Sequence, residues 1–120
     1  MKIAGYSIYN IYNNIVISNT SADGGGIYII LEPGFQLFQL DNNDVWGNPG
    51  GNYSGVAPGA HDISADALLI DPDHGDFHLS HDSPCIDAGD PIYFYTPDFD
   101  GQARPNGPSP DIGPDEYYPN

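Results

Sequence analysis

The stretch "NNIVISN", residues 13–19, returns later in the chain as "NNDVWGN", residues 42–48, at a constant offset of 29 residues. The recurring positions are Asn13, Asn14, Val16 and Asn19, which become Asn42, Asn43, Val45 and Asn48. Within that period the β-prone runs "IVIS", "GIYIIL" and "FQLFQL" alternate with the turn formers "ADGGG" and "EPG". Helical periodicity is sustained nowhere. The pattern predicts an all-β chain.

Short strands and turns that repeat at a fixed period are typical of a parallel β-helix. Its coils stack at about 4.8 Å, so residues one period apart lie directly above each other. The repeated asparagines should then form ladders, hydrogen-bonded to their copies and to the turn backbone. Asparagine is also favoured in ordinary turns, but that preference explains its position and not the repeated spacing. The ladder is the favoured interpretation.

Beyond Asn52 the repeat fades and the chain becomes rich in proline. Two short runs, "ALLID" and "DFHLS", are candidate strands, and prolines follow at positions 84, 91, 97, 105, 108, 110, 114 and 119. Terminal repeats of solenoids are atypical because they cover the last open edge. We therefore expect coils over residues 1–65 and a terminal coil with a C-terminal cap over residues 66–120.

Three segments together resemble a known family. They are "NNDVWGN", "ISADALLIDPDHGDFHLSHDSPCIDAGDP" and "PDFDGQARPNGPSPDIGPDEY", and they span roughly residues 42–118. In order and spacing they are similar to the C-terminal region of secreted bacterial proteins of the pectate-lyase-like superfamily. The resemblance implies a right-handed parallel β-helix of about three coils, an extracellular or cell-surface location, and an association with polysaccharide. Departures from the family pattern are Ala67, Cys85 and Pro114.

Cys85 is the only cysteine of the chain, so it cannot form an intrachain disulfide. The resemblance places it where the family usually has alanine, which implies a small, buried position. A thiol in apolar surroundings near carboxylates has a raised pKa and is inert. A nucleophile would need a cationic neighbour, and none lies close in the sequence. We expect Cys85 to be structural.

Charge is strongly one-sided: 17 carboxylates face only Lys2 and Arg104, giving a net charge of −15 over 120 residues. Nucleic acid is excluded as a partner, because phosphate binding depends on clustered Lys and Arg. The excess of Asp suits either calcium binding or simple solubility, and both readings stay open. The chain is long enough for one domain and contains 39% apolar residues, so we expect it to fold.

Two aspartate clusters are candidate calcium ligands: Asp98 with Asp100 in "PDFDG", and Asp71, Asp73 and Asp76 in "DPDHGD". Neither has the glutamate that completes a calcium loop, and Asp also initiates turns through its own backbone. Three histidines, at positions 74, 78 and 81, lie close to the second cluster. The odd separation of His78 and His81 places them on opposite faces of a strand, so the sequence favours surface histidines over a zinc site.

The sole arginine, Arg104, is expected to hold the cap together. Its planar guanidinium can bind two carboxylates, and the resemblance supplies Asp87, Asp111 and Glu116 as partners. The alternative is a catalytic base, because lyases of the resembled fold can use arginine beside a uronate. A chain of this charge would repel such an anionic substrate, so the structural role is favoured.

For function, the leading expectation is a non-catalytic, mainly structural portion of a polysaccharide-associated protein. Exposed aromatic rings would serve as platforms for sugars, and the candidates are Tyr9, Tyr12, Tyr28, Trp46 and Tyr53. The alternatives are a calcium-dependent binding module and a fragment of a polysaccharide lyase or glycoside hydrolase whose catalytic coils are missing. Hydrolases of that type carry paired carboxylates on several successive coils. This chain has too few coils to build such a groove.

The N-terminal region carries expectations of its own. No long apolar run follows Met1, which argues against a signal peptide or a membrane-spanning helix in this chain. Nothing before Ile3 resembles a cap, so the first coil should present an open strand edge. The apolar segment "YSIYNIY", residues 6–12, is then expected to join two copies as a two-fold homo-oligomer.

Overall fold

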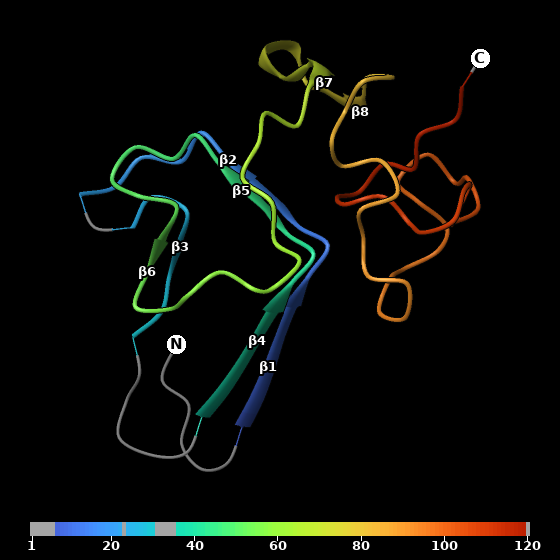
Figure 1. Cartoon of the computed structure of the whole chain (residues 1–120). Helices are drawn as coiled ribbons and strands as arrows, with labels where there is room; N and C mark the ends of the chain where they lie inside the picture. The colour runs from blue at the N-terminus through green and yellow to red at the C-terminus, as the bar shows by residue number, and fades with distance from the viewer. Residues whose placement is uncertain (1–6, 23, 31–35, 120) are drawn as a thin grey trace.

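The computed structural model describes residues 7–22, 24–30 and 36–119 (Figure 1). In these ranges short β-strands and one 3₁₀ turn alternate with irregular segments, and no α-helix occurs. The elements are β1 (Ser7–Tyr12), β2 (Ile15–Ile17), β3 (Ile27–Tyr28), β4 (Gln36–Asp41), β5 (Asp44–Trp46), β6 (Tyr53–Ser54), β7 (Leu69–Asp71), the 3₁₀ turn η1 (Pro72–His74) and β8 (Asp76–Leu79). The prediction of an all-β chain is confirmed for this part of the protein.

Strands from the two copies of the repeat lie side by side. β1 pairs with β4, β2 with β5 and β3 with β6, all parallel (Figure 1). Val16 lies opposite Val45, and the β1–β4 pair keeps the same 29-residue offset as the sequence repeat. The third pair is shifted, because Ile27 lies opposite Tyr53. β7 and β8 form an antiparallel pair.

The asparagine ladder predicted from the repeat is confirmed. Asn14 Nδ2 donates to Asn43 Oδ1 at 3.1 Å, and Asn19 Nδ2 donates to Asn48 Oδ1 at 3.2 Å. Asn43 Nδ2 also reaches the carbonyl of Ile11 at 2.8 Å, so the amide ties the two passes of the chain together. Both receiving asparagines are buried, where an unpaired amide would be costly.

The predicted solenoid is wrong. The described strands form four separate two-stranded sheets, and beyond the second pass only an isolated bridge, Asp44 to Ile63, continues the parallel stacking. The third pass is too short to add a strand of the same register. Asp62, only 19 residues after Asn43, already accepts the Asn43 hydrogen bonds that a third asparagine would take. The antiparallel β7–β8 pair then departs from coil geometry altogether. A right-handed β-helix of three coils is therefore corrected to two stacked passes followed by a hairpin.

The principal buried cluster joins the hairpin to the tail. Ala67, Leu79, Cys85 and Ile112 are its fully buried members. Cys85 is 0% exposed, as expected, and its thiol lies 3.4 Å from Asp44 Oδ2. Burial, with the Asp44 carboxylate second, raises the pKa of Cys85, so the thiol is unreactive.

The irregular tail, residues 80–119, packs beside the corner between β1 and β2 (Figure 1). Asn13, a turn residue with φ of 60°, makes the junction. Its Nδ2 donates to the carbonyl of Tyr93 at 2.8 Å, and its Oδ1 accepts from the Asp90 backbone N–H at 2.6 Å. One period later, Asn42 Nδ2 donates to the carbonyl of Ala88 at 3.0 Å. The repeated asparagines therefore fix the tail as well as the turns.

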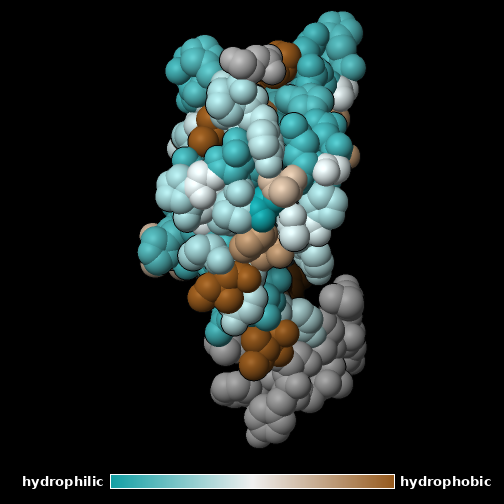
Figure 2. All heavy atoms as spheres, turned by 90° about the vertical axis from the view of Figure 1, so that its right-hand side faces the viewer, coloured by the Kyte–Doolittle hydropathy of each residue, from teal (hydrophilic) through white to brown (hydrophobic). Residues whose placement is uncertain are grey.

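Figure 2 shows the face on which the tail lies. Hydrophilic side chains cover most of it, and the hydrophobic side chains form separate groups. Within the described residues, no helix is long and apolar enough to cross a membrane.

Candidate functional site

The aspartates of the "DPDHGD" turn are engaged with histidines in the structure. Asp71 accepts a hydrogen bond from His74 Nδ1 at 2.9 Å, and Asp76 lies 2.5 Å from His78 Nδ1. Asp73 lies in η1 between them. Within the described part of the chain, these three carboxylates do not converge on a common point where an ion would bind.

Asp98 serves its own turn. Its Oδ1 accepts from the backbone N–H groups of Asp100 and Gln102, at 3.0 and 2.8 Å, and its Oδ2 accepts from Glu116 N–H at 2.9 Å. The side chain is buried. These bonds are those of a turn-forming aspartate. They occupy both oxygens of the Asp98 carboxylate, and Asp98 contacts its predicted partner Asp100 through the Asp100 backbone.

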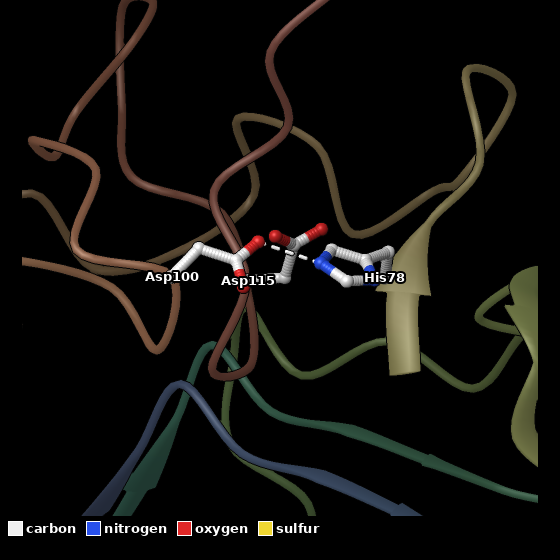
Figure 3. Close-up of side chains that lie close together, drawn as sticks. All are labelled: His78, Asp100 and Asp115. Carbon is white, nitrogen blue, oxygen red and sulfur yellow. Dashed lines mark hydrogen bonds and ion pairs between the residues drawn. The ribbon is translucent and has the colours of Figure 1, made fainter. Parts of the chain in front are cut away.

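Asp100 meets residues from two other segments instead (Figure 3). Its Oδ2 lies 2.6 Å from His78 Nε2, and Asp115 completes a group whose ligand atoms all lie within 4.8 Å of one another. The hydrogen bonds to Asp76 and then Asp100 raise the pKa of His78 to about 9. Burial raises the pKa of Asp115. The sequence pointed to His78 and Asp100 separately, but nothing in it places Asp115 beside them.

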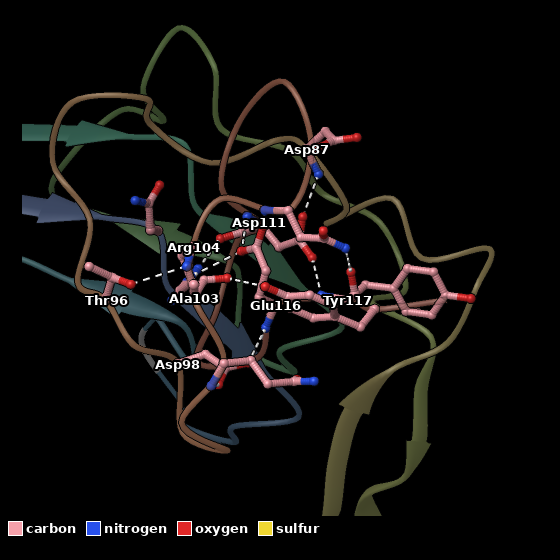
Figure 4. Close-up of polar contacts among 12 residues, drawn as sticks. Asp87, Thr96, Asp98, Ala103, Arg104, Asp111, Glu116 and Tyr117 are labelled. Carbon is pink, nitrogen blue, oxygen red and sulfur yellow. Dashed lines mark hydrogen bonds and ion pairs between the residues drawn. The ribbon is translucent and has the colours of Figure 1, made fainter. Parts of the chain in front are cut away.

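The Arg104 cluster lies at the centre of the tail (Figure 4). Arg104 Nε donates to Glu116 Oε2 at 3.0 Å, and Arg104 Nη2 donates to the backbone carbonyl of Asp111 at 2.6 Å. The two charged side chains are only 6% and 1% exposed. Of the expected partners, Glu116 pairs through its carboxylate and Asp111 through its main chain.

The carboxylates of Glu116 and Asp111 also accept hydrogen bonds from backbone N–H groups. Glu116 accepts from Asn106 and Asp111, at 2.7 and 3.0 Å. Asp111 accepts from Asp87 and Tyr117, at 2.7 and 2.6 Å, so Asp87 takes part through its backbone. Burial raises the pKa of Asp111 to about 6, although the two N–H donors oppose the shift. The cluster fixes an otherwise irregular segment.

A cleft of about 780 Å³ lies between the β1–β2 corner and the tail. Tyr12 forms one wall, and its ring stacks on Tyr93 with centroids 5.4 Å apart and planes 8° from parallel. Tyr93, Tyr95 and Phe99 also line the cleft and are 62%, 90% and 50% exposed. Large aromatic rings usually avoid water, so this concentration makes the cleft a candidate binding surface.

Polar groups accompany the rings. Asn10 and Asn14 line the strand side of the cleft and are exposed, and Asn14 also donates to the carbonyl of Tyr12 at 2.9 Å. Asp98 and Arg104 line the tail side, where both are already engaged within the tail. Because both Asn14 Nδ2 hydrogens are engaged, with Tyr12 and Asn43, Asn14 offers the cleft its Oδ1 as an acceptor. The cleft thus combines flat apolar faces with this acceptor and the Asn10 amide.

Of the five aromatic residues predicted from the sequence to contact sugar, only Tyr12 lies in this cleft. Tyr9 stacks on Phe38 at 4.9 Å, and the Tyr53 hydroxyl donates to Asp62 Oδ2 at 2.7 Å. Tyr28 and Trp46 are exposed elsewhere. Tyr93, Tyr95 and Phe99 were missed, although the run "IYFYTPDF", residues 92–99, carries an aromatic density that would have singled it out.

Comparison with known proteins corrects the resemblance to the pectate-lyase-like superfamily. A family described as disaggregatase related matches residues 2–89, whereas no curated protein and no solved structure matches the chain. The match covers the stacked strands and the hairpin, and it ends before the aromatic run of the tail. Because it spans most of the 120 residues, the chain belongs to the disaggregatase-related family.

Proposed function

We propose that this protein is a non-catalytic module that binds polysaccharide in the cleft between the β1–β2 corner and the tail. The observation that carries the proposal is the row of exposed rings, Tyr93, Tyr95 and Phe99, along one open cleft. A polysaccharide ligand would place the protein outside the cell or at its surface.

Sugar rings suit such a lining. One face of a pyranose carries C–H groups that pack against an aromatic ring, while its hydroxyls need donors and acceptors at the edge. Tyr93 and Tyr95 supply the rings, Asn10 supplies an amide, and Asn14 supplies its Oδ1 as an acceptor.

Charge narrows the class of ligand. With a net charge of −15, the protein repels polyanions such as uronate chains. Neutral hexose polymers and polymers of positively charged amino sugars are the favoured ligands.

The charged groups of the cleft favour binding over catalysis. Arg104, the one candidate base of the lyase hypothesis, is paired with Glu116 and bonded to the Asp111 carbonyl. Asp98 already accepts three backbone hydrogen bonds. Proton transfer to a substrate would require breaking these buried contacts.

Calcium and self-association remain part of the proposal. A bound calcium ion would make sugar binding sensitive to EDTA. Association of two copies through residues 6–12, of which residues 7–12 are described, would place two clefts on one particle and increase avidity.

The test is titration calorimetry of the full chain with oligosaccharides of neutral, amino-sugar and uronate type. We expect neutral or amino-sugar chains to bind and uronates not to bind. Replacing Tyr93 or Tyr95 with Ala should weaken binding about ten-fold, because a stacked ring contributes on the order of 1–2 kcal/mol.

The matched control is Tyr28→Ala, which removes a similarly exposed tyrosine outside the cleft. It should leave the affinity unchanged. Equal losses in the Tyr28 and Tyr95 variants, or tightest binding of a polyuronate, would contradict the proposal. Release of shortened oligosaccharides during the titration would favour the enzyme alternative.

A further inference from the structure

We propose that His78, Asp100 and Asp115 form a binding site for a divalent transition-metal ion of the zinc class. This site adjoins the sugar cleft, because Phe99, which lines the cleft, packs against His78 with ring centroids 5.0 Å apart. Its metal binding can be measured without any sugar. It is built from β8, the turn after Asp98 and the C-terminal segment. Each residue directs one ligand atom to a common point (Figure 3).

The distances suit a single ion. The three ligand atoms lie within 4.8 Å of one another. Ligands at about 2.0–2.2 Å from a tetrahedral zinc are separated by roughly 3.3 Å, so small side-chain movements suffice. The closest pair, His78 Nε2 and Asp100 Oδ2 at 2.6 Å, is now joined by a hydrogen bond. On binding, the ion replaces that proton, which leaves to solvent, and the two atoms move apart.

A second observation points to a metal. Asp76 Oδ1 holds His78 Nδ1 at 2.5 Å, on the side of the ring away from the site. Histidine ligands of metals almost always donate their other ring N–H to a carboxylate or carbonyl, which fixes the tautomer and the ring orientation. Asp76 therefore acts as a positioning residue that presents Nε2 to the ion.

The two carboxylates of the site differ in burial: Asp115 is a fixed ligand, and Asp100 lies where an ion can enter. Asp115 is only 3% exposed, and its Oδ2 accepts the Leu79 backbone N–H at 2.7 Å, so its position is fixed. Asp100 lies on an exposed turn with its side chain 40% exposed. An ion can enter beside Asp100, and water can complete the coordination.

The donor set favours zinc over calcium. An imidazole nitrogen with two carboxylate oxygens suits zinc and its first-row neighbours. Calcium prefers six to eight oxygen ligands and does not favour imidazole. Of the aspartates that the sequence offered as calcium ligands, only Asp100 is a ligand in this proposed site, where it joins a histidine nitrogen and a second carboxylate.

The test is titration of the chelator-treated full chain with ZnCl₂, CoCl₂ and CaCl₂. We expect one zinc ion per chain, a rise in melting temperature with zinc, and visible absorption on cobalt binding. His78→Gln and Asp100→Asn should each lower zinc affinity at least ten-fold. Asp76→Asn should lower it about ten-fold, as loss of an orienting partner does.

The matched control is His81→Gln. His81 is a neighbouring exposed histidine that pairs with Asp82 at 3.0 Å, outside the proposed site. It should bind zinc like the parent. Unchanged zinc affinity in both Asp100→Asn and His78→Gln would overturn the proposal, as would an equal loss in His81→Gln or tighter binding of calcium than zinc. Because Asp100 is exposed, Asp100→Asn should still fold, so it tests the proposal even if the His78 variant misfolds. None of these outcomes depends on sugar binding.

Discussion

Arg104 and Glu116 show how one ion pair can fix an irregular segment. The tail has little regular structure, yet its carboxylates accept backbone N–H groups from residues 87, 106, 111 and 117. Glu116 connects that network to the guanidinium. Since both charges are almost fully buried, each depends on the other.

Replacing Arg104 with Ala should therefore cost on the order of 3 kcal/mol or more of unfolding free energy, because Glu116 is left buried without its counter-charge. Urea denaturation measures the loss. Asp82→Ala is the control, since it breaks an exposed pair with His81 and should cost less than about 0.5 kcal/mol. A melting temperature of Arg104→Ala within a degree or two of the parent would contradict this role.

Asp111 should make stability depend on pH. Burial raises its pKa from 3.8 to about 6, and Glu116 and Asp87 add to the shift. The folded state then binds more protons than the unfolded state between those values, so the unfolding free energy falls as pH rises through that window. The expected loss is on the order of 3 kcal/mol.

Urea denaturation of the parent and of Asp111→Asn at pH 4, 5, 6 and 7 checks this. The variant should be less stable overall, because an amide nitrogen meets a backbone donor, but its pH slope should be smaller. Asp82→Asn is the control and should keep the parent slope. Parallel curves for the parent and Asp111→Asn would refute the prediction.

At the scale of elements, the asparagines hold the parallel strand pairs together. These pairs are only two strands wide, and a two-stranded sheet alone is marginally stable. Asn43 accepts from the Asn14 N–H, at 3.1 Å, and donates to the Ile11 carbonyl. It thus replaces sheet hydrogen bonds at the corner where β1 turns into β2.

Asn43→Ala should cost on the order of 2–3 kcal/mol, because it strands buried backbone groups at that corner. Chemical denaturation measures it, with Asn19→Ala as the control. Asn19 is the outer member of the second asparagine pair, Asn19–Asn48, and is exposed, so its loss should cost under about 1 kcal/mol. Equal losses of unfolding free energy in the two variants would show that burial of the asparagine has no effect on its contribution.

At the scale of the whole molecule, the paired strands expose apolar side chains to solvent. Ile8 of β1 is 65% exposed, and in the described residues β1 pairs on one edge with β4. Among the strands of that part of the chain the other edge of β1 has no partner, and an open edge next to exposed isoleucine favours association of copies.

The parent should therefore be dimeric at micromolar concentration, and Ile8→Lys should be monomeric and folded. Light scattering with circular dichroism measures both. Ile70→Lys is the control, since Ile70 is 55% exposed on the β7–β8 hairpin, and it should remain dimeric. A monomeric parent would refute association through this edge.

The sequence alone determined the all-β class and the pairing of Asn14 with Asn43. These follow from local spacing, which a linear pattern records. The burial of Cys85 is confirmed, but its expectation rested on a family resemblance that the comparison corrects. The repeat did not determine how far the stacking continues. That depends on the length of the third pass, where Asp62 closes the ladder early.

Only the tertiary structure brought His78, Asp100 and Asp115 to one point and opposed Tyr12 to Tyr93. Each group combines segments far apart in the chain, and the path of an irregular tail is set by its buried hydrogen bonds rather than by any periodicity. A sequence pattern records only neighbouring positions, whereas these sites form through contacts between segments that are distant in the sequence.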